Sequence, residues 1–182
     1  YDLVSGDVSR GHRALGGTVI IAHAEEYERA LQEHRVIVDQ ERRRELILSG
    51  LTARAEVLGG RWLDPGDVLA EATYLVESPS VENGRFSAAK LRLPPDVLIT
   101  AMQSHQRYFP VCAPDGQLLP VFLYVSNADP AFAELVTRGN QRVLEGRLDD
   151  AEFAYERDAA EGLRNMARRL DKVVFHERLG TL

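Results

Sequence analysis

The chain has 182 residues, of which 45% are hydrophobic, a composition typical of a folded globular protein rather than a disordered one. Lysine and arginine total 22 and aspartate and glutamate total 28, so the net charge is −6 and long-range attraction to nucleic-acid phosphates is disfavoured. The single cysteine excludes an internal disulfide, and no apolar run approaches the roughly 20 residues that a membrane-spanning helix needs.

The first 38 residues predict short strands followed by a helix. Glycine-containing turns at 6–7 and 16–17 break the strands of this region, and a β-prone run follows at 18–21. The apolar residues of 24–35 fall on one helical face, and a β-branched run follows at 36–38.

The middle of the chain predicts three helices separated by short β elements. Asp39 is a suitable cap for a helix that ends at the glycines 59–60, and the dipeptide 64–65 favours the start of a second helix reaching about Ala72. We then expect a strand at 73–76, a polar turn at 79–84 before another short strand, and a third helix that opens at Pro94 and runs through Met102.

A β-hairpin and a long helix are predicted for the rest of the chain. Strand-like runs at 107–111 and 119–126 are joined by a turn at 113–116. Apolar residues then recur at steps of four and three as far as Leu170, after a loop expected at Gly139-Asn140, and Gly162 predicts a break. We therefore expect an α+β body over residues 1–128, with packed helices on a mixed or antiparallel sheet, and a helical arm over residues 129–182.

No catalytic, nucleotide-binding or metal-binding signature is present. The sequence lacks a phosphate-binding glycine loop with a lysine and a nucleophile-elbow serine, and its five histidines are not spaced as metal ligands. We therefore assign no catalytic residue and no metal ligand to this chain.

The first candidate binding cluster is Arg10-Gly11-His12-Arg13. Two guanidinium groups and an imidazole around a glycine can hold an anion or line an RNA contact. The alternative is a polar loop paired with neighbouring acids. Other arginines, at 42–44, 138, 142 and 147, are more typical of solvated helix faces.

The second candidate cluster lies at 104–110, where a helix is expected to meet a strand. His105, Gln106, Arg107 and Tyr108 offer an aromatic ring that could stack on a base and polar groups that could contact its edge. The structural alternative is that the aromatic residues divide between core and surface while His105 and Arg107 satisfy backbone carbonyls.

Read in order, a series of short blocks resembles the glycyl-tRNA synthetase beta subunit family over the whole chain. The histidine-glutamine-basic-tyrosine-phenylalanine-proline-valine block, followed by a glycine-asparagine block, is specific in combination. A departure falls at Ser78-Pro79 and the polar residues 80–84, which leaves the strand pairing there in question. The blocks are 9–13, 36–39, 69–73 with 75–77, 93–98, 102–111, 125–127, 139–144 and 147–153.

The resemblance implies a part from the N-terminal half of the beta subunit of a cytoplasmic heterotetramer. In such an enzyme the alpha subunit binds glycine, ATP and magnesium and forms the glycyl adenylate, while the beta subunit supports recognition of tRNA(Gly). This segment is then a non-catalytic part that supports tRNA recognition and assembly with the alpha subunit. It is expected to resemble the B3/B4 domain of the phenylalanyl-tRNA synthetase beta subunit.

Two other functions are compatible with the same residues. The B3/B4 analogy, with His12, His105 and Arg107 converging in a cleft, would suit a hydrolytic editing or deacylase site. A pure subunit-interaction scaffold would instead leave apolar residues of the long helix exposed when no partner is bound.

Overall fold

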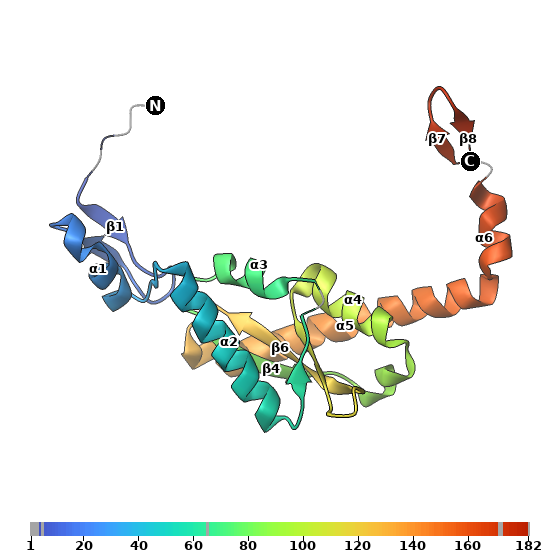
Figure 1. Ribbon diagram of the computed structural model, residues 1–182, viewed down its shortest axis with the longest axis horizontal. Helices are drawn as coiled ribbons and strands as arrows, with labels where there is room; N and C mark the ends of the chain where they lie inside the picture. The colour runs from blue at the N-terminus through green and yellow to red at the C-terminus, as the bar shows by residue number, and fades with distance from the viewer. Residues whose placement is uncertain (1–3, 5, 65, 171–172, 182) are drawn as a thin grey trace.

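The computed structural model describes residues 4, 6–64, 66–170 and 173–181, with the side chains of His105, Phe175 and Thr181 excepted. A small N-terminal unit lies at one end, a sheet with helices on both faces forms the middle, and a long helix leads to the C-terminal end (Figure 1). The expected α+β class and the long helix are confirmed.

The N-terminal unit is a hairpin with a helix. Strands β1 (Val8–Arg10) and β2 (Thr18–Ile20) pair antiparallel, and the 3-10 turn η1 (Ala24–Glu26) leads into α1 (Tyr27–Glu33). The β-branched run at 36–38 forms no strand. Two of its carbonyl groups instead accept hydrogen bonds from the guanidinium of Arg43, which also reaches the carbonyl of Thr73 and so ties this linker to the body.

The body is built on a four-stranded antiparallel sheet in the order β3-β5-β6-β4. Its strands are β3 (Arg61–Trp62), β5 (Phe109–Cys112), β6 (Leu118–Ser126) and β4 (Ser80–Arg85). The predicted hairpin between β5 and β6 is confirmed, and its turn places Gly116 at a φ of 88°, where glycine is favoured.

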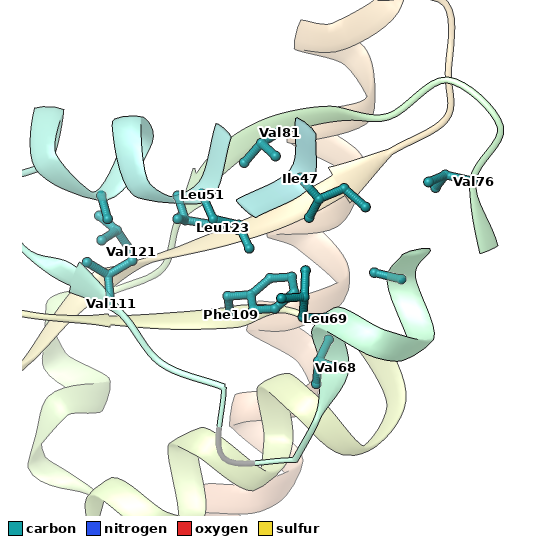
Figure 2. Close-up of a cluster of buried hydrophobic side chains, with 12 residues drawn as sticks. Ile47, Leu51, Val68, Leu69, Val76, Val81, Phe109, Val111, Val121 and Leu123 are labelled. Carbon is teal, nitrogen blue, oxygen red and sulfur yellow. The ribbon is translucent and has the colours of Figure 1, made fainter. Parts of the chain in front are cut away.

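Two helices cover one face of this sheet. Helix α2 (Gln40–Val57) begins at Asp39, whose side chain accepts the N–H of Glu41 as expected, and α3 (Val68–Leu75) follows β3. Figure 2 shows their apolar side chains meeting those of the strands. This core contains Ile47, Leu51, Ala55, Val68, Leu69, Ala72, Val76, Val81, Phe109, Val111, Val121 and Leu123.

The opposite face is covered by η2 (Ala88–Arg92), α4 (Pro95–Gln106) and α5 (Ala133–Glu161). Side chains of β6 alternate between the two cores, as the pleat of a strand requires: Val121 and Leu123 belong to the first, Phe122 and Tyr124 to the second. The second core also contains Phe86, Leu93, Leu98, Met102, Tyr108, Leu144 and Leu148.

The strand predicted at 73–76 is wrong, because residues 73–75 complete α3. The carboxylate of Asp64 accepts the N–H groups of Val68 and Leu69 and so caps this helix. The hydroxyl of Thr73 donates back to the carbonyl of Leu69. Packing of the apolar α3 face on the sheet outweighs the β propensity of the segment.

The polar turn predicted at 79–84 is also wrong, because Ser80–Arg85 is the edge strand β4. It pairs with β6 from Ser80 opposite Ser126 to Arg85 opposite Val121. Val81 points into the first core. An edge strand needs only one apolar face, so a segment with many polar residues can still pair regularly with its neighbour.

The C-terminal arm is formed by η3 (Pro130–Phe132), α5, α6 (Leu163–Leu170) and the hairpin of β7 (Val174–His176) and β8 (Gly180–Thr181). The predicted break is confirmed at Gly162, which has a φ of 73°. The loop expected at Gly139-Asn140 is wrong, since both residues lie within α5. Leu144 and Leu148 were counted with the arm, yet both are fully buried against the body.

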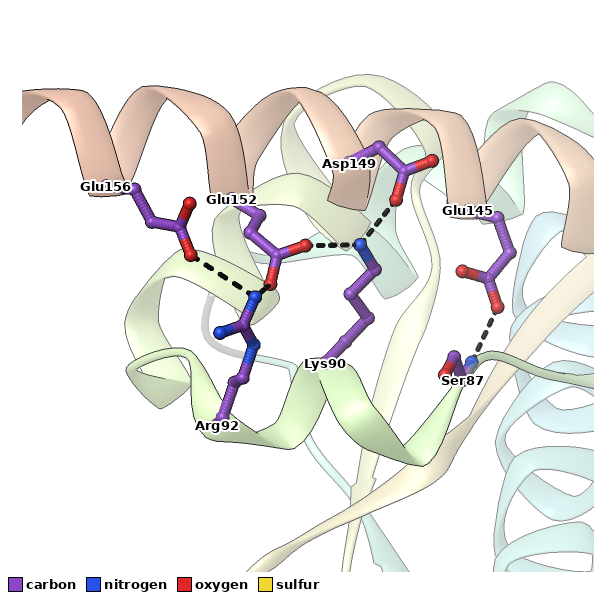
Figure 3. A network of polar contacts seen from close by, with 7 residues as sticks. All are labelled: Ser87, Lys90, Arg92, Glu145, Asp149, Glu152 and Glu156. Atoms are coloured by element: carbon purple, nitrogen blue, oxygen red, sulfur yellow. Dashed lines mark hydrogen bonds and ion pairs between the residues drawn. The ribbon is translucent and has the colours of Figure 1, made fainter.

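A cluster of charged residues fixes α5 to the body (Figure 3). The buried ammonium of Lys90 in η2 contacts the carboxylates of Asp149 and Glu152, the latter at 2.6 Å. Arg92 contacts Glu152 and, at 3.2 Å, Glu156. We call these five residues the η2–α5 clamp. They hold the middle of the long helix at a fixed place on the sheet.

Candidate functional site

His12 lies inside the N-terminal unit rather than on its surface. Its side chain is 2% exposed, and Nδ1 accepts the N–H groups of Ala14 and Leu15, each at 3.2 Å. Since Nδ1 accepts, the ring proton of the neutral imidazole lies on Nε2, which has no hydrogen-bond partner among the described atoms. This histidine organises the turn after β1.

The glycines beside His12 are required by close packing. A Cβ on Gly11 would lie 2.7 Å from Cβ of His34, and one on Gly16 would lie 2.2 Å from the backbone nitrogen of His12. Arg10 and Arg13, in contrast, are exposed and form no ion pair within the described part of the chain. The local structure therefore explains the glycine and the histidine of this cluster, and leaves the two arginines on the surface.

The second cluster sits at the C-terminal end of α4, as predicted. Arg107 ends the helix in a left-handed conformation, with φ 53° and ψ 41°, which is uncommon for a residue other than glycine. Its Nε donates to the carboxylate of Glu71 on α3. Both side chains are about half exposed, so this ion pair contributes no more than about 1 kcal/mol to stability.

Tyr108 is part of the second core. Its ring is 4% exposed and stacks on Phe122 at a centroid distance of 4.5 Å, so its faces are not open to a base. The hydroxyl donates to Oε1 of Gln106 at 3.3 Å, and burial raises the pKa of Tyr108 to about 12. His105 belongs to α4, and its side chain lies outside the described residues.

A small pocket opens where α3, α4, β6 and α5 meet, and we call it the junction pocket. Its volume is about 240 Å³. Gln106, Arg107 and Asn140 supply polar groups, and Leu75 and Val76 supply an apolar wall. The other lining residues are Ala72, Tyr108, Tyr124 and Val125.

Asn140 is the residue of the junction pocket that the sequence did not predict. A loop was expected at this position, whereas α5 carries its side chain to the wall of the junction pocket and close to the hydroxyl of Tyr124. That hydroxyl also contacts the hydroxyl of Thr137 at 2.7 Å. The available signal was that the glycine-asparagine block and the 102–111 block carry the family resemblance together.

The two candidate clusters are not brought together. The loop after β1 belongs to the unit at one end of the molecule, whereas the end of α4 lies in the body (Figure 1). Within the described residues, no three His, Cys, Asp or Glu side chains are grouped closely enough to hold a metal ion. None of the described helices is long and apolar enough to cross a membrane.

The chain is similar over its whole length to known proteins of one class and one family. The chain matches subunits of aminoacyl-tRNA synthetases, the ligases that join amino acids to tRNA. A family profile described as glycyl-tRNA synthetase beta subunit matches residues 1–182, and the chain belongs to that family.

Several curated relatives cover almost all of the chain. It is 41% identical over 182 residues to the glycine–tRNA ligase beta subunit of Syntrophomonas wolfei, with 100% of the chain and 26% of that protein covered. It is 44% identical over 184 residues to that of Pediococcus pentosaceus, again with 100% and 26% covered. The chain therefore spans about a quarter of the length of these relatives, and it corresponds to their N-terminal part.

Proposed function

We propose that this chain is a non-catalytic part of a glycyl-tRNA synthetase beta subunit, which supports recognition of tRNA(Gly) and assembly with the alpha subunit. Binding of glycine, ATP and magnesium and the ligation itself belong to the alpha subunit in this proposal. The relatives are beta subunits of glycine–tRNA ligases, and the match extends over the whole chain.

The observation that carries the recognition role is the junction pocket. Four of the sequence blocks that resemble the family meet there, through Leu75 and Val76, Gln106 and Arg107, Val125, and Asn140. Core packing accounts for Tyr108 and Phe109 in these blocks, but Gln106, Arg107 and Asn140 line a surface pocket. Amide and guanidinium groups at such a place suit the edge or phosphate of an unstacked nucleotide.

Because the net charge is −6, this recognition must rest on local contacts rather than on a basic field. Arg10 and Arg13 offer a second, separate contact from the N-terminal unit. The deacylase alternative is not favoured, since it needed His12 beside Arg107 in one cleft, and His12 is buried within the N-terminal unit whereas Arg107 lies in the body.

The test is to replace Gln106 and Asn140 by alanine, together, in the assembled enzyme and to measure the dissociation constant for tRNA(Gly). We expect a loss of about 1–3 kcal/mol of binding free energy, the range of a lost specific contact. Gln117→Ala, which changes an exposed glutamine of the β5–β6 turn, is the matched control and should bind normally. Unchanged affinity of the double variant would remove the recognition role of this pocket.

Assembly through apolar contacts has its own support. Leu163, Val174 and Leu179 of the C-terminal arm are 85%, 64% and 73% exposed, which is what an interaction surface on the arm requires.

A further inference from the structure

The outer face of helix α5 carries exposed apolar side chains. Leu135, Val143 and Phe153 are exposed on it, while Leu144 and Leu148 face the core. Leu135, Gly139, Val143, Gly146, Asp150 and Phe153 follow one another at steps of four and three, so they lie along one side of the helix, with the exposed acid Asp150 among them. We call this row the outer stripe of α5.

Two members of the outer stripe are glycines that the fold itself does not need. Gly139 and Gly146 stand seven positions apart within the helix, and a Cβ added to either would meet nothing within 4 Å. Glycine is the poorest helix former after proline, so two of them inside one helix weaken it. They would be useful where another backbone approaches the helix closely, between the apolar side chains of Leu135 and Val143.

Charges of both signs lie in and beside the outer stripe. Arg138, Arg142 and Arg147 are exposed near it, and Asp150 lies within it. Arg138 contacts Glu134, whereas Arg142 and Arg147 have no carboxylate at ion-pair distance among the described side chains. The stripe is therefore no uniformly basic surface for an RNA backbone, and its exposed leucine, valine and phenylalanine fit the apolar face of an amphipathic helix.

The size of the stripe favours a partner in the same polypeptide. From Leu135 to Phe153 the helix extends about 27 Å, and a contact strip about 10 Å wide covers on the order of 300 Å². A stable complex between separate molecules usually buries about 800 Å² on each partner. A tethered segment needs less contact because its effective concentration is high. The relatives are about four times as long as this chain, so most of such a subunit lies outside the structure.

We propose that the outer stripe of α5 is the docking site for an amphipathic helix from the remaining part of the same beta subunit, packed closely over Gly139 and Gly146. This surface does not depend on the role of the junction pocket in tRNA recognition.

The proposal is tested by cysteine accessibility in the full-length beta subunit, without the alpha subunit or tRNA. Leu135→Cys and, separately, Val143→Cys place thiols on the stripe, and Val57→Cys places one on α2, where the native residue is 85% exposed. Alkylation with a maleimide is followed site by site by mass spectrometry. We expect both stripe thiols to react at least tenfold more slowly than the thiol at position 57.

A second substitution makes the result specific to the glycines. Gly146→Leu, added to Leu135→Cys, should obstruct close packing and return the thiol to the rate seen at position 57. Equal rates at positions 135, 143 and 57 in the full-length subunit would overturn the proposal. So would protection that arises only when the alpha subunit or tRNA is added, or that depends on protein concentration as a second copy would require.

Discussion

Replacing Lys90 by methionine should loosen α5 from the body. The substitution keeps the aliphatic stem but removes the ammonium that contacts Asp149 and Glu152 (Figure 3). Lys90 is buried, so the loss exceeds the 0–1 kcal/mol typical of a surface ion pair. Asp149 stays in contact with water and Glu152 keeps Arg92, so the loss is smaller than the 3–5 kcal/mol of a fully buried pair. We expect about 2 kcal/mol, or a melting temperature lower by about 4–8 °C.

Urea unfolding of Lys90→Met at pH 7 measures this loss, with Arg92→Met as control. The Arg92 side chain is 63% exposed, and its replacement should cost less than about 1 kcal/mol. A double variant with Glu152→Gln should lose less than the sum of the two single changes, because they remove one shared contact. A loss below about 0.5 kcal/mol for Lys90→Met, or full additivity in the double variant, would refute the reasoning.

The stability that the clamp contributes should also fall at both alkaline and acid pH. Hydrogen bonds to Asp149 and Glu152 raise the pKa of Lys90 above its usual 10.5, so its stabilising effect is complete below that pH and is lost as the pH rises through the higher folded value. The bond from Lys90 lowers the pKa of Glu152 below 4.5, so its effect is complete above that pH and is lost on acidification. The free energy of unfolding of Lys90→Met should therefore differ most from that of the native chain between these two pH limits.

Three further predictions concern the core and the end of α4. Gly84→Ala would place a Cβ 2.3 Å from Cζ of Phe122 and should lower the free energy of unfolding by about 1–3 kcal/mol in urea; an unchanged value would contradict the close packing. Arg107→Gly should have a free energy of unfolding about 1 kcal/mol higher than that of Arg107→Ala in urea, because only glycine adopts the left-handed conformation without strain. Equal free energies of unfolding would contradict this. Because the pKa of Tyr108 is raised to about 12, native stability should fall as the pH rises from about 10 to 12, and Tyr108→Phe should reduce that slope in alkaline unfolding experiments.

Local signals were sufficient where a segment's own chemistry decides its structure. Asp39 predicted the start of α2, Gly162 the end of α5, and the turn before β6 the hairpin, because capping and turn geometry involve residues close in sequence. β4 and the end of α3 were missed because distant partners decide them. Ser80–Arg85 becomes a strand only when β6 lies beside it, and Thr73 becomes helical because α3 packs on the sheet.

The same distinction applies to the candidate site. The pattern around Gln106 and Arg107 predicted a junction between helix and strand, which the structure confirms. It could not show that Tyr108 turns into the core or that His12 is enclosed by its own turn, since burial depends on the whole fold. Nor could it place Asn140 and Gln106 on the wall of one pocket, because the two residues share that pocket only through the docking of α5 on the body. Whether residues 1–128 form a domain separate from the arm stays a prediction.

The most direct measurement of the central claim is site-specific photocrosslinking in the assembled enzyme. A photoreactive side chain replaces Gln106 at the junction pocket in one preparation and Gln117 in the exposed β5–β6 turn in another, and each is irradiated with tRNA(Gly). We predict a covalent adduct with tRNA from position 106, suppressed by excess unlabelled tRNA(Gly), and none from position 117. Failure of position 106 to crosslink in an enzyme that still charges tRNA would contradict the claim that this pocket contacts tRNA.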